Sequence, residues 1–124
     1  MNCGAASWQR VMPLLAPHVR VAAYDRAGIG GSAPAPGLVT IDRQVDDLAS
    51  VITGLAAGPC VLAGHSWGGI LVQLLAFRRP DLAAGLVLVD QGMRRWKADF
   101  PGPSSGGGGS CAPSSPMSCT MTPP

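Results

Sequence analysis

Ser66 is the residue of this chain best placed to do chemistry. It is the centre of a Gly-x-Ser-x-Gly pattern, with Gly64 before it and Gly68 after it. A short apolar run at residues 60–63 precedes the pattern, and a long apolar segment follows it. This order predicts a strand, a tight turn and a helix, the context that lifts a serine hydroxyl above a sheet edge as a nucleophile. Such a serine attacks carbonyl carbons in acyl transfer.

A serine hydroxyl also needs a general base, usually a histidine that a carboxylate orients. The sequence contains two histidines, His18 and His65, and neither of them follows Ser66. Neighbouring side chains at a strand end point to opposite faces, so we expect His65 to lie beneath the turn. His18 enters a predicted strand at its N-terminal end, roughly 20 Å from the edge where active sites of such sheets lie. We therefore assign the role of base to neither histidine.

Two further residues are candidates for the same site. Asp90 ends the apolar run at residues 86–89, at the sheet edge where Ser66 is expected, and is the candidate acid. Its alternative role is a carboxylate that fixes a loop, and Asp99 is a weaker candidate acid. Trp67 supplies the backbone N–H after the serine, a candidate oxyanion donor. The Trp67 side chain is expected to line an acyl pocket or to pack.

Predicted strands and helices alternate along residues 1–92. A helical spacing of apolar residues covers residues 8–15, where Pro13 should kink or shorten the helix. Another apolar stripe predicts an amphipathic helix over residues 41–55, with Thr40 as N-cap, and residues 69–79 predict a buried helix. Apolar runs predict strands at 19–24, 60–63 and 86–89. Continuous runs indicate parallel strands covered on both faces, so the predicted fold class is α/β.

Four blocks of this sequence, in this order and spacing, resemble the α/β-hydrolase family. Residues 8–15 resemble its first helix, 19–32 its fourth strand and following loop, 64–69 its nucleophile elbow, and 86–90 its sixth strand. The resemblance implies a serine hydrolase that cleaves a small-molecule ester or amide by acyl transfer through Ser66, without a cofactor. Ser66 excludes the acidic nucleophile of dehalogenases and epoxide hydrolases of this fold. Cofactor-free haloperoxidase-like relatives also use serine, so that alternative stays open.

The resemblance covers only part of the fold. The family's third strand and its His-Gly are replaced by residues 1–3, which leaves Gly4 or Ala5 as the candidate second oxyanion donor. The usual acid and the histidine of the family also have no counterpart here. The sequence therefore predicts a catalytically incomplete hydrolase, and the alternative is a non-enzymatic truncated or pseudoenzyme form. Without the third strand, the strands at 19–24 and 60–63 must pair with each other or leave open edges.

Composition sets further limits. The length of 124 residues supports one domain, which we place at residues 1–92, and the Pro/Gly/Ser-rich residues 93–124 are expected to form a disordered tail. A net charge of +2 argues against nucleic acid or a membrane surface as partner. No apolar run reaches about 18 residues and no signal peptide is evident, so a cytoplasmic location is the default expectation. Substrate and oligomeric state stay open.

The cysteines predict no metal site. None of the four forms a Cys-x-x-Cys pair or is accompanied by histidine, and Cys60 is expected to be a small core residue of its strand. A small basic cluster at residues 94–97 is expected to be solvated.

The loop after residue 24 contains two motifs. The glycines of Gly28-x-Gly30-x-x-Ala33 superficially match a dinucleotide fingerprint, but prolines follow where that fingerprint requires a helix, so no nucleotide site is predicted. Asp25 and Arg26 are instead expected to brace the backbone of this loop.

Overall fold

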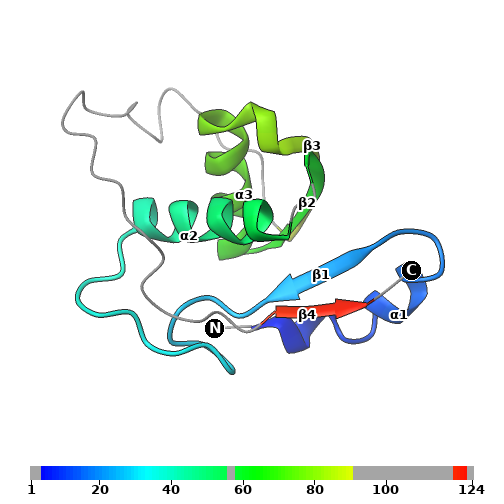
Figure 1. Cartoon of the computed structure of the whole chain (residues 1–124), viewed down its shortest axis with the longest axis horizontal. Helices are drawn as coiled ribbons and strands as arrows, with labels where there is room; N and C mark the ends of the chain where they lie inside the picture. Colours follow the sequence, from blue (N-terminus) through cyan, green and yellow to red (C-terminus); the bar gives the residue numbers. More distant parts are fainter. Residues whose placement is uncertain (1–3, 56–57, 91–118, 123–124) are drawn as a thin grey trace. The chain divides into compact units, whose positions relative to one another are not determined.

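The computed structural model describes residues 4–55, 58–90 and 119–122. These residues form two compact units, each of which is described by itself (Figure 1). The first unit contains the described residues up to Val39 together with a strand near the C-terminus. The second unit begins at Thr40 and contains the Gly-x-Ser-x-Gly segment. The α/β class is confirmed, because the second unit combines a parallel strand pair with helices.

The second unit is built around strands β2 (Cys60–His65) and β3 (Ala83–Val89), which pair in parallel. Helix α3 (Trp67–Arg78) and the short 3-10 helix η2 (Pro80–Leu82) connect them. Helix α2 (Ile41–Gly54) packs against α3 (Figure 1). The predicted strands thus extend further than expected, and α3 begins directly after Ser66 rather than at Gly69.

Helix α3 forms the core of the second unit. Its sequence is apolar almost all round, and an unbroken run from Gly69 to Leu75 is buried. Leu71, Leu74 and Leu75 are almost completely excluded from solvent, as is Val45 of α2. The predicted stripe of α2 is confirmed, because Val45, Leu48 and Ile52 are its buried residues. Burial of these faces fixes the position of α3. It thereby also fixes Ser66, the residue directly before the helix.

The predicted N-cap of α2 is confirmed. The Thr40 hydroxyl accepts a hydrogen bond from the Arg43 N–H at 3.2 Å, and the Thr40 backbone is extended. This bond satisfies one of the amide groups that the first helical turn leaves without an intrahelical acceptor.

Replacement of this cap gives a first testable prediction. Thr40→Ala should lower the free energy of unfolding by about 1 kcal/mol, because the capped amide loses its acceptor. Ser50→Ala is the matched control, since the Ser50 hydroxyl lies on the surface of α2 and bonds only the Asp46 carbonyl of its own helix at 2.9 Å. Urea unfolding of both variants checks this, and equal losses would contradict the capping role.

One face of the β2–β3 pair is open in the part of the chain that the structure describes. Leu62 and Gly64 are buried, whereas Val61 is 63% exposed, Val87 48% and Val89 40%. The expectation that both faces are covered is therefore wrong for the described residues. Helix α3 packs on one face of the pair, and continuous apolar runs do not by themselves supply a second layer.

The first unit contains little regular structure. Its elements are the 3-10 helix η1 (Ala5–Trp8), the short helix α1 (Met12–Leu15) and strand β1 (Val21–Tyr24). The helix predicted over residues 8–15 is therefore much shorter. Pro13 is the second residue of α1, in the first turn, where a missing N–H costs nothing, so it does not kink the helix.

Strand β1 pairs with neither of the strands in the second unit. Its partner is β4 (Cys119–Thr122), which runs antiparallel to it, with Val21 opposite Thr122 (Figure 1). The sequence analysis expected β1 either to pair with the strand at 60–63 or to keep an open edge. The pairing with β4 is neither of these. The physical reason is that β1 offers an open edge, to which any extended segment can hydrogen-bond. The predicted disorder of residues 93–124 otherwise lies outside the described residues.

Candidate active site

Ser66 stands at the junction of β2 and α3, as the pattern predicts. Its backbone has φ 49° and ψ −115°, a conformation that residues other than glycine rarely adopt. Strain of this kind costs on the order of 1–3 kcal/mol and is typical of functional turns. The Ser66 N–H donates to the Val89 carbonyl at 3.1 Å, and the Ser66 carbonyl accepts from Gly69 N–H at 2.9 Å. The residue is exposed to solvent.

Gly64 explains how the turn can be so tight. A Cβ at this position would lie 2.5 Å from the Gly68 carbonyl carbon and 2.6 Å from the Gly69 nitrogen. Both are backbone atoms at the start of α3, so they cannot move aside as a side chain could. A Cβ on Gly68, by contrast, meets nothing within 4 Å outside its own helix turn. Gly64 is therefore required because the backbone at the start of α3 approaches it closely. Gly68 contributes part of that backbone.

The Trp67 N–H is the first amide of α3 after the serine. The first amides of a helix have no intrahelical acceptor, which makes this group available to an anionic oxygen. Trp67 is 39% exposed, and its indole Nε1–H donates to Gln44 Oε1 of α2 at 3.0 Å. This hydrogen bond holds the indole ring against the neighbouring helix α2.

Asp90 directly follows β3, as Ser66 directly follows β2, so the two residues lie at the same end of the parallel strand pair. The backbone of Asp90 also has a positive φ, 50°, and its side chain is 88% exposed. Asp90 Oδ2 lies 3.9 Å from Nε2 of His65, which is the last residue of β2. His65 continues the exposed alternation of β2, on the face opposite to buried Gly64. The structure therefore brings together Ser66, His65 and Asp90 at one end of the strand pair, with the imidazole directed to the carboxylate.

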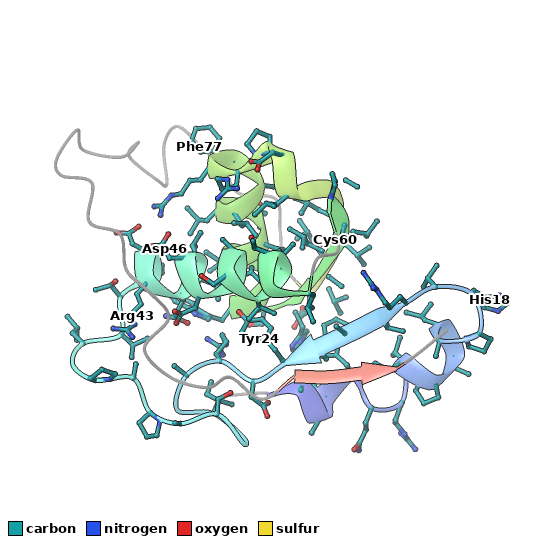
Figure 2. The ribbon with its side chains drawn as sticks, in the orientation of Figure 1. His18, Tyr24, Arg43, Asp46, Cys60 and Phe77 are labelled. Carbon is teal, nitrogen blue, oxygen red and sulfur yellow. The ribbon has the colours of Figure 1, made fainter. Side chains whose placement is uncertain are left out.

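His18 lies in the first unit, between α1 and β1, where it is exposed (Figure 2). The sequence predicts a strand that begins directly after His18, at residue 19, but β1 begins two residues later, at Val21.

Asp25 organises the loop after β1. Its carboxylate accepts hydrogen bonds from the Ala5 N–H at 2.6 Å and the Gly31 N–H at 3.0 Å, and its carbonyl accepts from the Ser32 hydroxyl at 2.6 Å. The predicted bracing role of this carboxylate is confirmed. Because Asp25 engages the Ala5 N–H, Ala5 is the weaker of the two residues considered as second oxyanion donor. No helix follows the Gly28 loop before Ile41, in line with the absence of a dinucleotide fingerprint.

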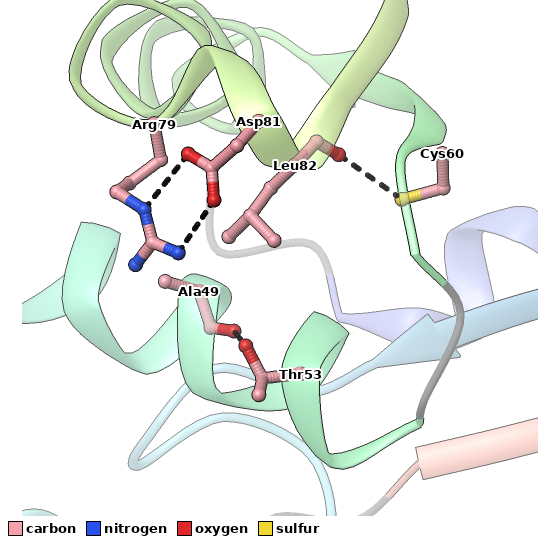
Figure 3. A network of polar contacts seen from close by, with 6 residues as sticks. All are labelled: Ala49, Thr53, Cys60, Arg79, Asp81 and Leu82. Carbon is pink, nitrogen blue, oxygen red and sulfur yellow. Dashed lines mark hydrogen bonds and ion pairs between the residues drawn. The ribbon is translucent and has the colours of Figure 1, made fainter.

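At the opposite end of the strand pair, the polar contacts are structural (Figure 3). The half-buried Cys60 thiol donates to the Leu82 carbonyl at 3.8 Å, and burial raises the pKa of this thiol. Arg79 leaves α3 and bonds both carboxylate oxygens of Asp81, at 3.0 and 2.7 Å. This guanidinium lowers the pKa of the exposed Asp81 carboxyl. A raised pKa leaves less thiolate, the nucleophilic form, so Cys60 is a weak candidate nucleophile.

Gln44 is the residue of this site that the sequence analysis missed. It lies one position before buried Val45 and three after Ile41, so a polar side chain falls beside the apolar stripe of α2. That placement was the available signal, since polar groups near a buried face are usually hydrogen-bonded.

Two features of the described residues bear on other functions. No group of three or more histidine, cysteine or acidic side chains gathers there in a way that could hold a metal ion. Among the same residues, no helix is long and apolar enough to cross a membrane.

Comparison with known proteins gives consistent matches. Residues 2–117 match the model of a family described as the alpha/beta hydrolase family. A lipase of Mycobacterium tuberculosis is 42% identical over 83 residues, which are 67% of this chain and 31% of the lipase. A strigolactone esterase of Pisum sativum is 32% identical over 88 residues, covering 68% of this chain and 33% of the esterase.

An epoxide hydrolase of Xenopus tropicalis is 33% identical over 86 residues, covering 68% of this chain and 23% of that protein. The chain thus spans a third or less of the length of these curated relatives.

Proposed function

Because this chain belongs to the alpha/beta hydrolase family, we propose that it carries the nucleophile of a serine hydrolase that cleaves small-molecule esters or amides. The observation that carries the proposal is Ser66 itself, an exposed serine with φ 49° between strand β2 and the largely buried helix α3. The names of the lipase and the strigolactone esterase support ester chemistry. A serine rather than a carboxylate at this position favours acyl transfer over the opening of an epoxide through an acidic nucleophile.

The proposed reaction assigns a role to each residue. Ser66 Oγ forms a bond to the carbonyl carbon while its proton passes to a base, and the carbonyl oxygen becomes an oxyanion. The Trp67 N–H donates to that oxyanion. Collapse of the intermediate breaks the bond to the alcohol or amine, and water then removes the acyl group from Ser66. Asp90 is the candidate acid that would orient the base.

The base is the part of the proposal that these 124 residues do not supply. No histidine follows Ser66 in the sequence, and His65 is the direct neighbour of Ser66, so its side chain is expected on the opposite face from the serine hydroxyl. We therefore propose that the chain by itself is catalytically incomplete, with a nucleophile and an oxyanion donor but without the group that activates the serine. Loss of the base from such a site lowers the rate by orders of magnitude and leaves what binding and the oxyanion donor provide.

A non-enzymatic form of the fold is the second candidate. The open face with exposed Val61, Val87 and Val89 favours it, because a packed hydrolase core would cover such a surface. This candidate predicts no acyl transfer to Ser66 under any condition.

Acylation of Ser66 by p-nitrophenyl acetate separates the two candidates. We expect the folded chain to gain one acetyl group on the peptide that contains Ser66, and we expect added imidazole to accelerate this, since a small base can enter the exposed site. Ser66→Ala is the control and should gain no acetyl group on that peptide. Absence of acetyl-Ser66 from a folded chain at high imidazole would favour the non-enzymatic candidate.

A further inference from the structure

The hydrogen bond between Trp67 and Gln44 joins α2 to the residue that follows the nucleophile. Nε1 of Trp67 donates to Oε1 of Gln44 at 3.0 Å, a normal length for this bond. Indole is a donor only, and the amide oxygen of glutamine is an acceptor only, so the polarity of the contact is fixed. The two residues are 23 positions apart in the sequence, and α2 and α3 pack against each other.

The amide of Gln44 is itself held in one orientation. Its Nε2 donates to the Thr40 carbonyl at 3.4 Å, one turn back along α2. With the nitrogen directed to Thr40 and the oxygen to Trp67, a flip of the amide would break both contacts. The next residue, Val45, is 1% exposed, so the helix that carries Gln44 cannot easily turn. Gln44 is thus a fixed acceptor on a fixed helix.

The fixed position of Gln44 affects the strained turn at Ser66 because Gln44 holds the side chain of the next residue, Trp67. The peptide between Ser66 and Trp67 carries the proposed oxyanion donor, and Ser66 occupies a backbone conformation that the surroundings must enforce. Stabilisation of an oxyanion depends on a donor whose direction is set before the reaction. Because the indole is hydrogen-bonded through Nε1, rotation of the Trp67 backbone is restricted. Because Trp67 is 39% exposed, part of its surface remains accessible beside the proposed nucleophile.

We propose that Gln44 is a positioning residue for the acyl-transfer site. It holds the Trp67 indole, which keeps the Trp67 N–H directed at the oxyanion and makes the ring a fixed apolar wall for the acyl group. The inference rests on the proposed function, since it assigns to Gln44 an effect on the reactivity of Ser66. It also predicts a preference for acyl groups with apolar surface.

The test compares four variants by the rate at which p-nitrophenyl butyrate acylates Ser66 in imidazole buffer. Gln44→Leu removes the acceptor at similar volume, and Trp67→Phe removes the donor but keeps an aromatic ring. Each should lower the acylation rate about five- to tenfold, the effect of one lost hydrogen bond. The double variant should be no slower than the slower single variant, because the two changes remove the same contact. Gln44→Glu retains an acceptor and should remain close to the unchanged chain.

A spectroscopic readout reports the contact without reference to reactivity. In a chain with Trp8→Phe and Trp96→Phe, the only indole is that of Trp67. Its Nε1–H proton resonance should shift in Gln44→Leu and stay in place in Gln9→Leu, the matched control in the first unit.

The possible outcomes separate the two proposals. Normal acylation of Gln44→Leu, an additive double variant, or an unmoved indole resonance would overturn the positioning role while Ser66 still reacts. Absence of acyl-Ser66 from the unchanged chain would overturn the proposed function, and the positioning role with it.

Discussion

Gly64→Ala is expected to destabilise the second unit by about 3 kcal/mol, the upper end of the usual range for groups forced into a packed site. The added Cβ would lie 2.6 Å from the Gly69 nitrogen, so strand β2 and helix α3 must separate for it to fit. The loss should be seen as a lower midpoint of urea unfolding, followed by Trp67 fluorescence in the chain whose other tryptophans are replaced by phenylalanine.

Gly68→Ala is the matched control within the same motif. Nothing outside its own helix turn lies within 4 Å of a Cβ at this position. Alanine is also a better helix former than glycine, by roughly 0.5–1 kcal/mol, so this variant should be as stable as the unchanged chain or more stable. Equal destabilisation by the two alanines would mean that the close approach at Gly64 does not exist in solution.

Leu75→Ala should cost about 2–5 kcal/mol, because Leu75 is 0% exposed and its loss leaves a cavity between α3 and its neighbours. Phe77→Ala on the same helix is the control, since Phe77 is 54% exposed and its removal opens no buried cavity (Figure 2). Its effect should stay below about 1 kcal/mol. The same fluorescence-detected urea unfolding checks both variants. A larger loss from Phe77→Ala would contradict the proposed core.

Much of the second unit can be predicted from its sequence because the signals are local. The stripe from Ile41 to Leu55 repeats with the period of a helix, and Thr40 stands where a cap is needed. Gly64 likewise permits the tight turn at Ser66 by its own lack of a side chain. These features depend on residues within a few positions of one another, so a single sequence is sufficient to find them.

The parts that sequence reasoning missed depend on contacts between distant segments. The Gln44–Trp67 bond requires the packing of α2 against α3, which no local pattern specifies. The pairing of β1 with β4 joins residues about a hundred positions apart, and an open strand edge does not select its partner by side-chain pattern. Coverage of a sheet face was also misjudged, because a continuous apolar run is compatible with one covered face or two.

The positions of the candidate site residues in the fold were predicted, but their contacts were not. Ser66, Trp67 and Asp90 each lie at the strand ends where the sequence analysis expected them. The approach of His65 to Asp90 follows from the parallel register, in which His65 is paired with Val89. Register could not be read from the sequence, since a shift of one position reverses which face each side chain occupies.

The measurement that tests the central claim most directly is labelling of the folded chain with a fluorophosphonate, with and without imidazole, beside Ser66→Ala. The account predicts slow labelling at Ser66 alone, a rate that rises with imidazole, and no labelling of Ser66→Ala. Fast labelling without imidazole would contradict catalytic incompleteness. No labelling of a folded chain at any imidazole concentration, or equal labelling of Ser66→Ala, would contradict the assignment of Ser66 as the nucleophile.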